Sequence, residues 1–302
     1  MNEAERPIVV GLGELLCDVF PDSRRPGGAP ANVAFQANQL GCRGIVSSRV
    51  GCDPLGDELI DFLTSQGLAV DCVQRDPRHP TGTVTVDTSR ADHPDYVIHQ
   101  EVAWDYLTFD ADLKRLAARA SAVCFGTLAQ RSPVAREAIQ KTLEAVRPDC
   151  LVVYDVNLRQ RWYQRETVQR SMARARIVKL NADEVTVLAS LLETGTADPE
   201  PFARVIQTRY GVETVCITRA ERGCLLVGPK ATVDRPGVPV DVADSVGAGD
   251  AFTAALIVSH LRGWPLEAQA ELANRVGALV ASRPGAMPPL VDEFAALLAK
   301  RC

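Results

Sequence analysis

The sequence predicts an α/β protein in which helices flank both faces of a mostly parallel sheet. Short apolar runs alternate with longer amphipathic stretches along most of the 302 residues, which is the pattern of repeated βαβ units. Hydrophobic residues make up 46% of the chain and charged residues 24%, so there is enough apolar material for a large core. The last third is rich in small residues, which indicates consecutive helices packed closely on the sheet.

The expected strands are short and apolar, as strands buried on both faces are. They occupy residues 8–10, 45–50, 122–125, 151–154, 177–180 and 215–217. Amphipathic helices are expected after several of these strands, at 54–66, 133–146 and 182–192. Three more helices are expected near the C-terminus, at 247–261, 266–281 and 291–298.

One region departs from this rhythm. Within residues 81–100, apolar and polar side chains alternate over 83–87, which is the period of a strand with one apolar face. A turn-like stretch at 90–94 and a second strand at 96–98 complete a β-hairpin. We expect this hairpin to project from the sheet as a small lid; the alternative is a surface hairpin without function.

Composition and charge argue against several classes of protein. Lys plus Arg is 33 and Asp plus Glu is 38, and a net charge of −5 disfavours a nucleic-acid binder. No apolar run approaches the roughly 18 residues of a membrane helix, and the start, MNEAERP, lacks the apolar segment of a signal peptide. Nine scattered cysteines without a CxxC pair favour reduced thiols over disulfides or a zinc site. We therefore expect a cytoplasmic protein with no membrane partner.

The best candidate for chemistry is a Gly-rich stretch that runs directly into an apolar helix, Asp244-Ser245-Val246-Gly247-Ala248-Gly249-Asp250. Small residues let the backbone approach a ligand closely, and the unpaired N–H groups of a helix start favour a phosphoryl group. Asp250 would repel a phosphate, so it fits the role of a base for an acceptor hydroxyl. The alternative is a Gly-rich turn in which Asp250 only caps the helix.

A second Gly-rich stretch also leads into a helix, Gly27-Gly28-Ala29-Pro30-Ala31-Asn32. The glycine pair permits close approach of the backbone, and Asn32 offers both a donor and an acceptor to a polyol. The alternative is a loop with a helix cap. Asp18, shortly before, is interpreted as a carboxylate for sugar hydroxyls. An apparent dinucleotide motif after the first strand has Leu16 in place of its third glycine, so no dinucleotide site is expected.

Polar residues follow two of the expected strands, where the ligand crevice of an open α/β sheet lies. Asp155-Val156-Asn157-Leu158-Arg159 follows the run at 151–154. Asn181 and Glu184 follow the run at 177–180, and their spacing places them on one face of a helical turn. Together these residues could hold a hydrated Mg²⁺. The alternative is a capping box, in which Asn181 and Glu184 satisfy each other's backbone N–H groups.

Together these motifs resemble those of the PfkB, or ribokinase-like, carbohydrate kinase family, and their sequences are most similar to those of the fructokinases. Gly27-Gly28…Asn32 is similar to the family's N-terminal signature and Asp244…Asp250 to its C-terminal one. The resemblance spans nearly the whole chain. It implies a ribokinase-like three-layer sandwich, with residues 1–302 as one kinase domain and a small β lid from about 14–24 and 81–104. It further implies transfer of the γ-phosphoryl group of ATP to a sugar hydroxyl, and a homodimer through the lid is plausible.

The resemblance also implies roles for the matching residues. Asp250 would be the catalytic base, and the backbone N–H groups of residues 247–249 would form the anion hole. Three further sets would bind the sugar (Asp18, Gly28, Asn32, Arg159), place Mg²⁺ through water (Asn181, Glu184) and bind the nucleotide (Thr218, Gly223, Asn274). A monovalent cation such as K⁺, near Asp244 and Gly285, is common in the family.

Three positions depart from the family pattern and bear on the substrate. Ser245 replaces a usual Thr, His99 stands roughly where many sugar-acid kinases have Arg, and Ala220 replaces a Gly, so a positive φ there would strain it. A sugar acid needs a cation, which Arg159 or Arg131 could supply. Taken together, these positions favour a neutral hexose over a sugar acid, with fructose as the leading substrate. The alternatives are 2-keto-3-deoxygluconate or another sugar of the family, and, from another class, a nucleotide- or sugar-binding protein without turnover.

Overall fold

A nine-stranded sheet forms the centre of the protein in a computed structural model that describes residues 6–87 and 95–300. Its strands are β1 (Ile8–Leu12), β4 (Arg43–Gly51), β5 (Val73–Asp76), β8 (Ala122–Gly126), β9 (Leu151–Asp155), β10 (Ile177–Asn181), β11 (Thr214–Thr218), β12 (Cys224–Val227) and β13 (Thr232–Arg235). Their order is β13-β12-β11-β10-β9-β8-β1-β4-β5. All neighbours pair in parallel except β11–β12 and β12–β13. The predicted mostly parallel sheet is therefore confirmed, and each of the six predicted apolar runs lies in it.

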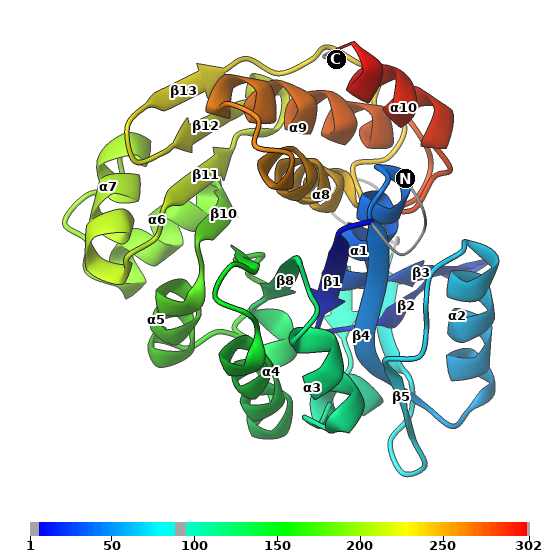
Figure 1. Cartoon of the computed structure of the whole chain (residues 1–302). Coiled ribbons are helices and arrows are strands. Elements are labelled where there is room, and N and C mark those ends of the chain that lie inside the picture. Colours follow the sequence, from blue (N-terminus) through cyan, green and yellow to red (C-terminus); the bar gives the residue numbers. More distant parts are fainter. Residues whose placement is uncertain (1–5, 88–94, 301–302) are drawn as a thin grey trace.

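Helices cover both faces of this sheet, which makes three layers (Figure 1). One face carries α1 (Ala29–Gln39), α8 (Ala248–Leu261), α9 (Leu266–Ala281) and α10 (Val291–Ala299). The other carries α3 (Ala111–Ala117), α4 (Pro133–Ala145), α5 (Arg165–Arg174), α6 (Ala182–Leu191) and α7 (Pro199–Tyr210). Outside these layers, α2 (Pro54–Ser65) packs beside β4, and short 3₁₀ turns occur at η2 (Ala103–Tyr106), η3 (Leu128–Gln130) and η4 (Ala220–Arg222).

The alternation of side chains along each strand divides the core into two layers. Val9 packs in the cluster that contains α8 and α9, whereas its neighbour Val10 packs in the cluster that contains α4 to α7. This is why the strands are apolar on both faces. Lys179 in β10 departs from this apolar pattern, because it is a charged residue that is only 7% exposed.

Four further strands form a second sheet that is not hydrogen-bonded to the large one. Its strands are β2 (Leu16–Val19), β3 (Arg24–Gly27), β6 (Gly82–Asp87) and β7 (Asp95–Ile98), in the order β3-β2-β6-β7. Two of them, β2 and β3, are labelled beside β4 in Figure 1. β6 and β7 pair antiparallel, as the predicted hairpin requires, while the expected turn at 90–94 and residues 1–5 lie outside the described residues. A Cβ on Gly82 would come within 2.4 Å of the buried Trp104 indole, so the small sheet lies directly on η2.

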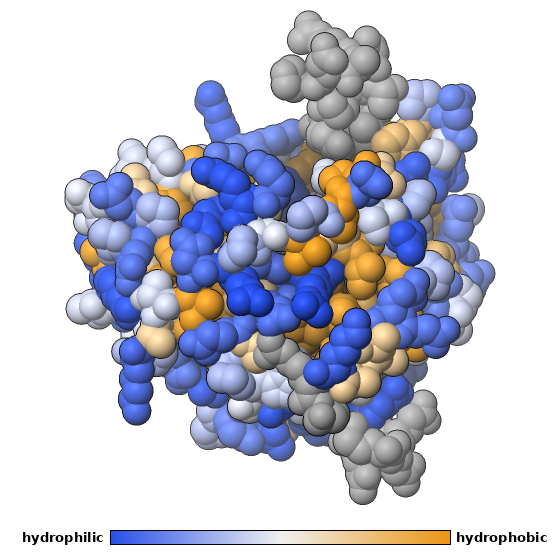
Figure 2. Space-filling view, turned by 90° about the horizontal axis from the view of Figure 1, so that it is seen from above, coloured by the Kyte–Doolittle hydropathy of each residue, from blue (hydrophilic) through white to orange (hydrophobic). Residues whose placement is uncertain are grey.

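The surface is mixed in hydropathy (Figure 2), and most of the thiols are buried. Figure 2 shows hydrophobic patches separated by hydrophilic residues, the mixture usual for a protein surface. Eight cysteines in the described part of the chain are unpaired, and six of them are buried. None of the helices described has the length and apolarity that a membrane crossing needs.

Candidate active site

The carboxyl ends of β1, β9 and β10 and the first turns of α1 and α8 bring most of the predicted residues to one edge of the large sheet. Asp155 ends β9, Asn181 ends β10, and Asn32 lies in the first turn of α1. Asp250 lies in the first turn of α8. Such an edge is where open α/β sheets bind their ligands.

Asp250 and Asn32, which are 218 residues apart in sequence, meet at the centre of this edge. The Asn32 Nδ2 group donates a hydrogen bond of 2.7 Å to Asp250 Oδ2. Burial, and then the charge of Asp155, raise the pKa of Asp250 to about 6, while Asn32, Lys179 and Arg159 act to lower it. A carboxyl group with this pKa is deprotonated at neutral pH but is a stronger base than a solvated aspartate.

The start of α8 has the geometry of an anion site. Gly247 has φ 77° and a Cβ there would lie 2.6 Å from Ala286 Cα, so this position requires glycine. Ala248 N donates to Ser245 O at 3.3 Å, whereas the N–H groups of Gly249 and Asp250 have no acceptor among the described residues. Unpaired N–H groups and the positive end of the helix dipole favour a phosphoryl group.

The second Gly-rich stretch packs on the chain that follows β1. Gly28 has φ 115°, and a Cβ there would lie 2.4 Å from Glu14 O, which explains the glycine. Asp18, on β2, lies against Gly27, because a Cβ on that glycine would be 2.9 Å from Asp18 Oδ2. Burial raises the pKa of Asp18 to about 6, although Arg159 and Arg25 act to lower it.

Arg159 is an exposed residue whose charge reaches the carboxyl groups of the site. It lies in the loop after β9, where Asn157 and Gln160 have positive φ values of 40° and 50°. Its charge acts to lower the pKa of Glu14, Asp18 and Asp250. Arg159 therefore lies near three acidic side chains, of which the sequence had indicated two.

A buried ion pair behind the start of α8 was not predicted. Lys179 Nζ donates to both carboxylate oxygens of Asp155 at 3.1 Å, and Thr253 Oγ1 donates to Asp155 Oδ2 at 2.8 Å. A Cβ on Gly249 would lie 3.2 Å from Lys179 Nζ, so the ammonium lies directly behind the anion site. Burial opposes the charge of Lys179, but Asp155, Glu184 and Asp250 together raise its pKa above the ordinary value. The signal in the sequence was a single lysine inside an apolar strand.

Asn181 and Glu184 form the capping box that the sequence left open as an alternative to metal binding. Asn181 Oδ1 accepts from Glu184 N at 2.9 Å, and Glu184 Oε2 accepts from Asn181 N at 2.7 Å. Glu184 Oε1 also accepts from Leu158 N at 2.7 Å, and the side chain is buried. The described residues contain no cluster of three metal-binding His, Cys, Asp or Glu side chains. The oxygens of these two side chains are therefore engaged with backbone N–H groups, as the capping-box alternative predicts.

The residues expected at the nucleotide lie farther along the same sheet. Asn274, on α9, donates to Pro236 O at 3.1 Å, and a Cβ on Gly223 would collide with the same backbone segment, at 2.5 Å from Pro236 C. Thr218 is the last residue of β11 and is paired with Asn181, the last residue of the neighbouring strand β10. A cavity of about 380 Å³ lies beside Asn274 and Pro236. The region expected to bind the nucleotide therefore contains Thr218, Gly223 and Asn274 and lies next to the capping box.

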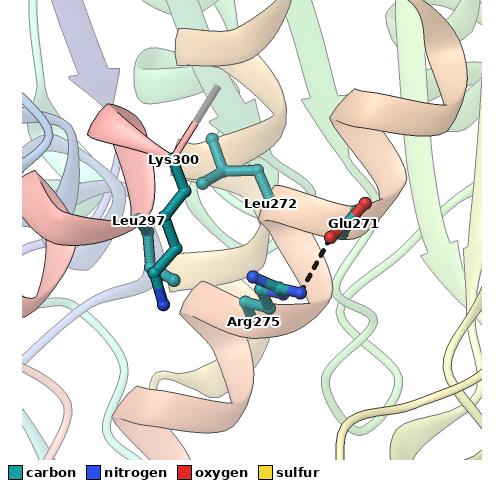
Figure 3. Close-up of a pocket in the computed structure, with 5 residues that line it drawn as sticks. All are labelled: Glu271, Leu272, Arg275, Leu297 and Lys300. Carbon is teal, nitrogen blue, oxygen red and sulfur yellow. Dashed lines mark ion pairs between the residues drawn. The ribbon is translucent and has the colours of Figure 1, made fainter. Parts of the chain in front are cut away.

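The nucleotide loop and the neighbouring helices add two details. Ala220 has φ 50°, so the replacement of glycine there does place an alanine in the left-handed region. A second cavity, of about 370 Å³, lies between α9 and α10 and is lined by Glu271, Leu272, Arg275, Leu297 and Lys300 (Figure 3). Glu271 and Arg275, which form a 2.9 Å ion pair, line both cavities.

The small sheet is tied to the loop before α8 through Asp244. Arg25 Nη1, on β3, donates to Asp244 Oδ2 at 3.1 Å. The same carboxylate accepts from Gly285 N at 3.1 Å and from Val246 N at 3.0 Å. Asp244 and Gly285, the residues expected near a monovalent cation, are therefore in contact, and the cationic group that Asp244 binds in this structure is the Arg25 guanidinium.

Arg131, considered as a cation for a sugar acid, is committed elsewhere. Its guanidinium binds both carboxylate oxygens of Asp105 at 2.8 Å and lies over the rings of Trp104 and Trp162, at 4.0 and 5.1 Å from their centroids. Its side chain is only 4% exposed. This arrangement makes Arg131 part of the packing below the small sheet.

Known proteins resemble this chain over nearly its whole length. Residues 10–293 match the model of the pfkB family of carbohydrate kinases. An uncharacterized sugar kinase from Pyrococcus horikoshii is 30% identical, over 95% of this chain and 94% of the relative. Its crystal structure has a TM-score of 0.82, at 29% identity over 96% of this chain and 97% of its own, and a second structure of it contains ATP.

Fructokinases are among the other relatives. The Salmonella typhimurium fructokinase is 29% identical, over 92% of this chain and 94% of the relative. A structure of a double mutant of Vibrio cholerae fructokinase, with fructose, ADP and a potassium ion bound, has a TM-score of 0.83 at 26% identity, over 97% of this chain and 98% of its own. With the family model matched from β1 to α10, this chain belongs to the pfkB family of carbohydrate kinases.

Proposed function

We propose that the protein transfers the γ-phosphoryl group of ATP to a hydroxyl of a neutral hexose, with fructose as the leading substrate. The observation that carries this choice is the charge of the sugar side of the site. Glu14, Asp18 and Asp250 all lie within electrostatic reach of Arg159, and Arg25 also acts on Asp18, so three acidic side chains outnumber the two arginines there. Arg131, the other candidate cation, is bound to Asp105. A sugar with its own carboxylate would meet like charges.

In this proposal Asp250 removes the proton from the attacking hydroxyl. Phosphoryl transfer has a loose transition state, so the protein contributes mainly by positioning and by stabilising charge. The Asn32 amide holds one oxygen of Asp250 and thereby fixes the direction of the other. The free N–H groups of Gly249 and Asp250 would face the transferring group, with Lys179 behind them as a positioning residue.

Mg²⁺ and a monovalent cation complete the proposed set of cofactors. A Mg²⁺ ion carried by ATP would neutralise phosphate charge, and Asn181 and Glu184 fit it only through water, since their oxygens already accept backbone N–H groups. A K⁺ ion near Asp244 would compete with Arg25 for one carboxylate oxygen. The fructokinase of Vibrio cholerae supports its inclusion, because that protein was solved with potassium.

We also propose that the four-stranded sheet acts as a lid over the sugar. Arg25 on β3 reaches across to Asp244, so this sheet contacts the loop that precedes α8. Closure would exclude water and limit wasteful hydrolysis of ATP. We also predict a homodimer that forms through this sheet, and light scattering would measure its mass in solution. A cytoplasmic location is supported by the unpaired cysteines of the described residues and by the need for ATP.

The test is release of ADP, in a coupled assay with Mg-ATP, against fructose, glucose, ribose, 2-keto-3-deoxygluconate, fructose 6-phosphate and adenosine. Fructose is expected to give the highest kcat/KM, about 100-fold above the keto-acid, because the acidic pocket repels a carboxylate. Parallel reactions in potassium and in tetramethylammonium buffers measure the role of the monovalent cation.

A preference for 2-keto-3-deoxygluconate would mean that Arg159 binds a carboxylate and that the charge argument is wrong. ADP release with none of the sugars, together with ATP binding, would favour a nucleotide-binding protein without turnover. The next residue to test would then be Ala220, which has a φ of 50° and replaces the glycine of the family pattern in the nucleotide loop.

The pH dependence of kcat/KM is a separate prediction. A general base works only when deprotonated, so kcat/KM should fall as the pH drops below about 6 and should level off above it. The carboxyl groups of Asp18 and Glu14, with pKa values of about 6 and about 7, titrate nearby. The fall in kcat/KM on the acid side of the pH profile, the acid limb, will therefore report the coupled titration of the three carboxyl groups. Initial rates between about pH 5 and about pH 8, a range that spans the raised pKa values of these three carboxyl groups, measure this fall.

The matched variant for this prediction is Asn32→Leu. It removes the hydrogen bond that lowers the pKa of Asp250, so the acid limb should move to higher pH even though the rate also falls. A limb that stays in place in Asn32→Leu would show that Asp250 is not the group that titrates.

A further inference from the structure

Two buried oxygen atoms near Asp250 have no hydrogen-bond partner among the residues that the structure describes. They are Glu14 Oε2 and Asn32 Oδ1. Glu14 is 3% exposed and Asn32 is 4% exposed, so water does not replace the missing partners at the surface. Buried acceptors without donors cost free energy, and a native structure keeps them where an ordered water, an ion or a ligand supplies the donor or where they serve a function.

The two acceptors belong to one wall of the site. Glu14 follows β1, and its backbone carbonyl lies 2.4 Å from the position that a Cβ of Gly28 would take. Asn32 N donates to Gly28 O at 2.9 Å, so Gly28 connects the two residues. The Glu14 carboxyl is also within electrostatic reach of Asp250.

We propose that Glu14 is a further sugar-binding residue, whose carboxyl oxygen accepts a hydrogen bond from a non-reacting hydroxyl of the substrate while Asn32 Oδ1 accepts from another. The inference rests on the proposed function and sharpens it. The substrate must present at least two hydroxyl donors besides the one that receives the phosphoryl group. Analogues that lack one of them leave a buried acceptor unpaired and are rejected.

The chemistry of Glu14 suits this role. Burial, together with the charge of Asp250, raises its pKa to about 7, although backbone N–H groups and Arg159 act in the opposite direction. Near neutral pH the group can therefore exist in both protonation states and can exchange hydrogen bonds with a polyol.

The experiment combines variants of Glu14 with fructose and its monodeoxy analogues, each lacking one non-reacting hydroxyl. The wild-type enzyme should discriminate against two of these analogues by about 10- to 100-fold in kcat/KM. Glu14→Gln should lower kcat/KM for fructose about tenfold, and Glu14→Ala should abolish discrimination against one analogue while keeping it against the other. The dissociation constant for ATP should stay within about twofold in both variants, because Glu14 lies on the sugar side.

Glu137→Gln is the matched control, since Glu137 is an exposed glutamate on α4 with a side chain 66% exposed. It should leave every constant unchanged. The wild-type series needs no variant to fold, and equal rates with all analogues would overturn the inference. Equal losses for fructose and every analogue in Glu14→Ala would also overturn it, as the effect would then be structural. If the wild-type enzyme turns over no sugar at all, the proposed function fails and takes this inference with it.

Discussion

Replacing Asp250 by Asn is expected to lower kcat about 1,000-fold, within the range that a general base contributes. The carboxamide oxygen of the new side chain can still accept the hydrogen bond from Asn32 Nδ2, so the shape of the site is kept. It cannot take the proton of the attacking hydroxyl. Positioning and the free N–H groups of α8 remain, and the residual rate measures their share.

KM for the sugar and for ATP should change by less than about threefold, because only the transition state loses an interaction. Single-turnover kinetics with the wild-type enzyme and the variant separate this chemical step from binding. The matched control is Asp112→Asn on α3, an exposed aspartate with a side chain 58% exposed, which should leave kcat unchanged. A variant at position 250 with near-normal kcat would rule out Asp250 as the base.

The fold could be predicted because its strands are buried on both faces. Runs such as 122–125 and 177–180 are apolar for a physical reason that the sequence displays directly. The edge strand β13, Thr-Val-Asp-Arg, was missed because it is short and mostly polar, whereas β12, Cys-Leu-Leu-Val, is a buried apolar run that the pattern did contain. Helix α5 was missed because it carries three arginines and buries only one narrow side. Edge elements depend on their neighbours, which a local pattern does not contain.

The site could be predicted where glycines mark a close approach, and less well where single side chains act. Gly28 and Gly247 both have positive φ and no room for a Cβ, so their motifs were visible. Glu14 and Lys179 each stand alone in an apolar stretch, and only the fold places them beside Asp250. The two apparent dinucleotide glycines also have a structural reason, since a Cβ on Gly11 would lie 1.9 Å from Pro30 O.

Lys179→Met is expected to lower the free energy of unfolding by about 4 kcal/mol, because it leaves the Asp155 carboxylate buried and without its counter-ion. Asp155 is 3% exposed, and Thr253 would remain as its side-chain donor. Thermal unfolding followed by circular dichroism should show a Tm lower by about 10 °C. Lys141→Met is the matched control, because Lys141 pairs with Glu137 on the surface of α4; it should cost less than about 1 kcal/mol.

The double variant Lys179→Met with Asp155→Asn separates the ion pair from simple packing. Asparagine keeps an acceptor for Thr253 and removes the unpaired charge, so much of the lost stability should return. The pH profile gives a second reading, because Lys179 lowers the pKa of Asp250 and Asp155 raises it. The acid limb should move to higher pH in the single variant and return toward its original position in the double variant. Equal stability losses for Lys179→Met and Lys141→Met would show that the buried pair does not support the fold, and an acid limb that does not move in Lys179→Met would show that the pair does not act on the base.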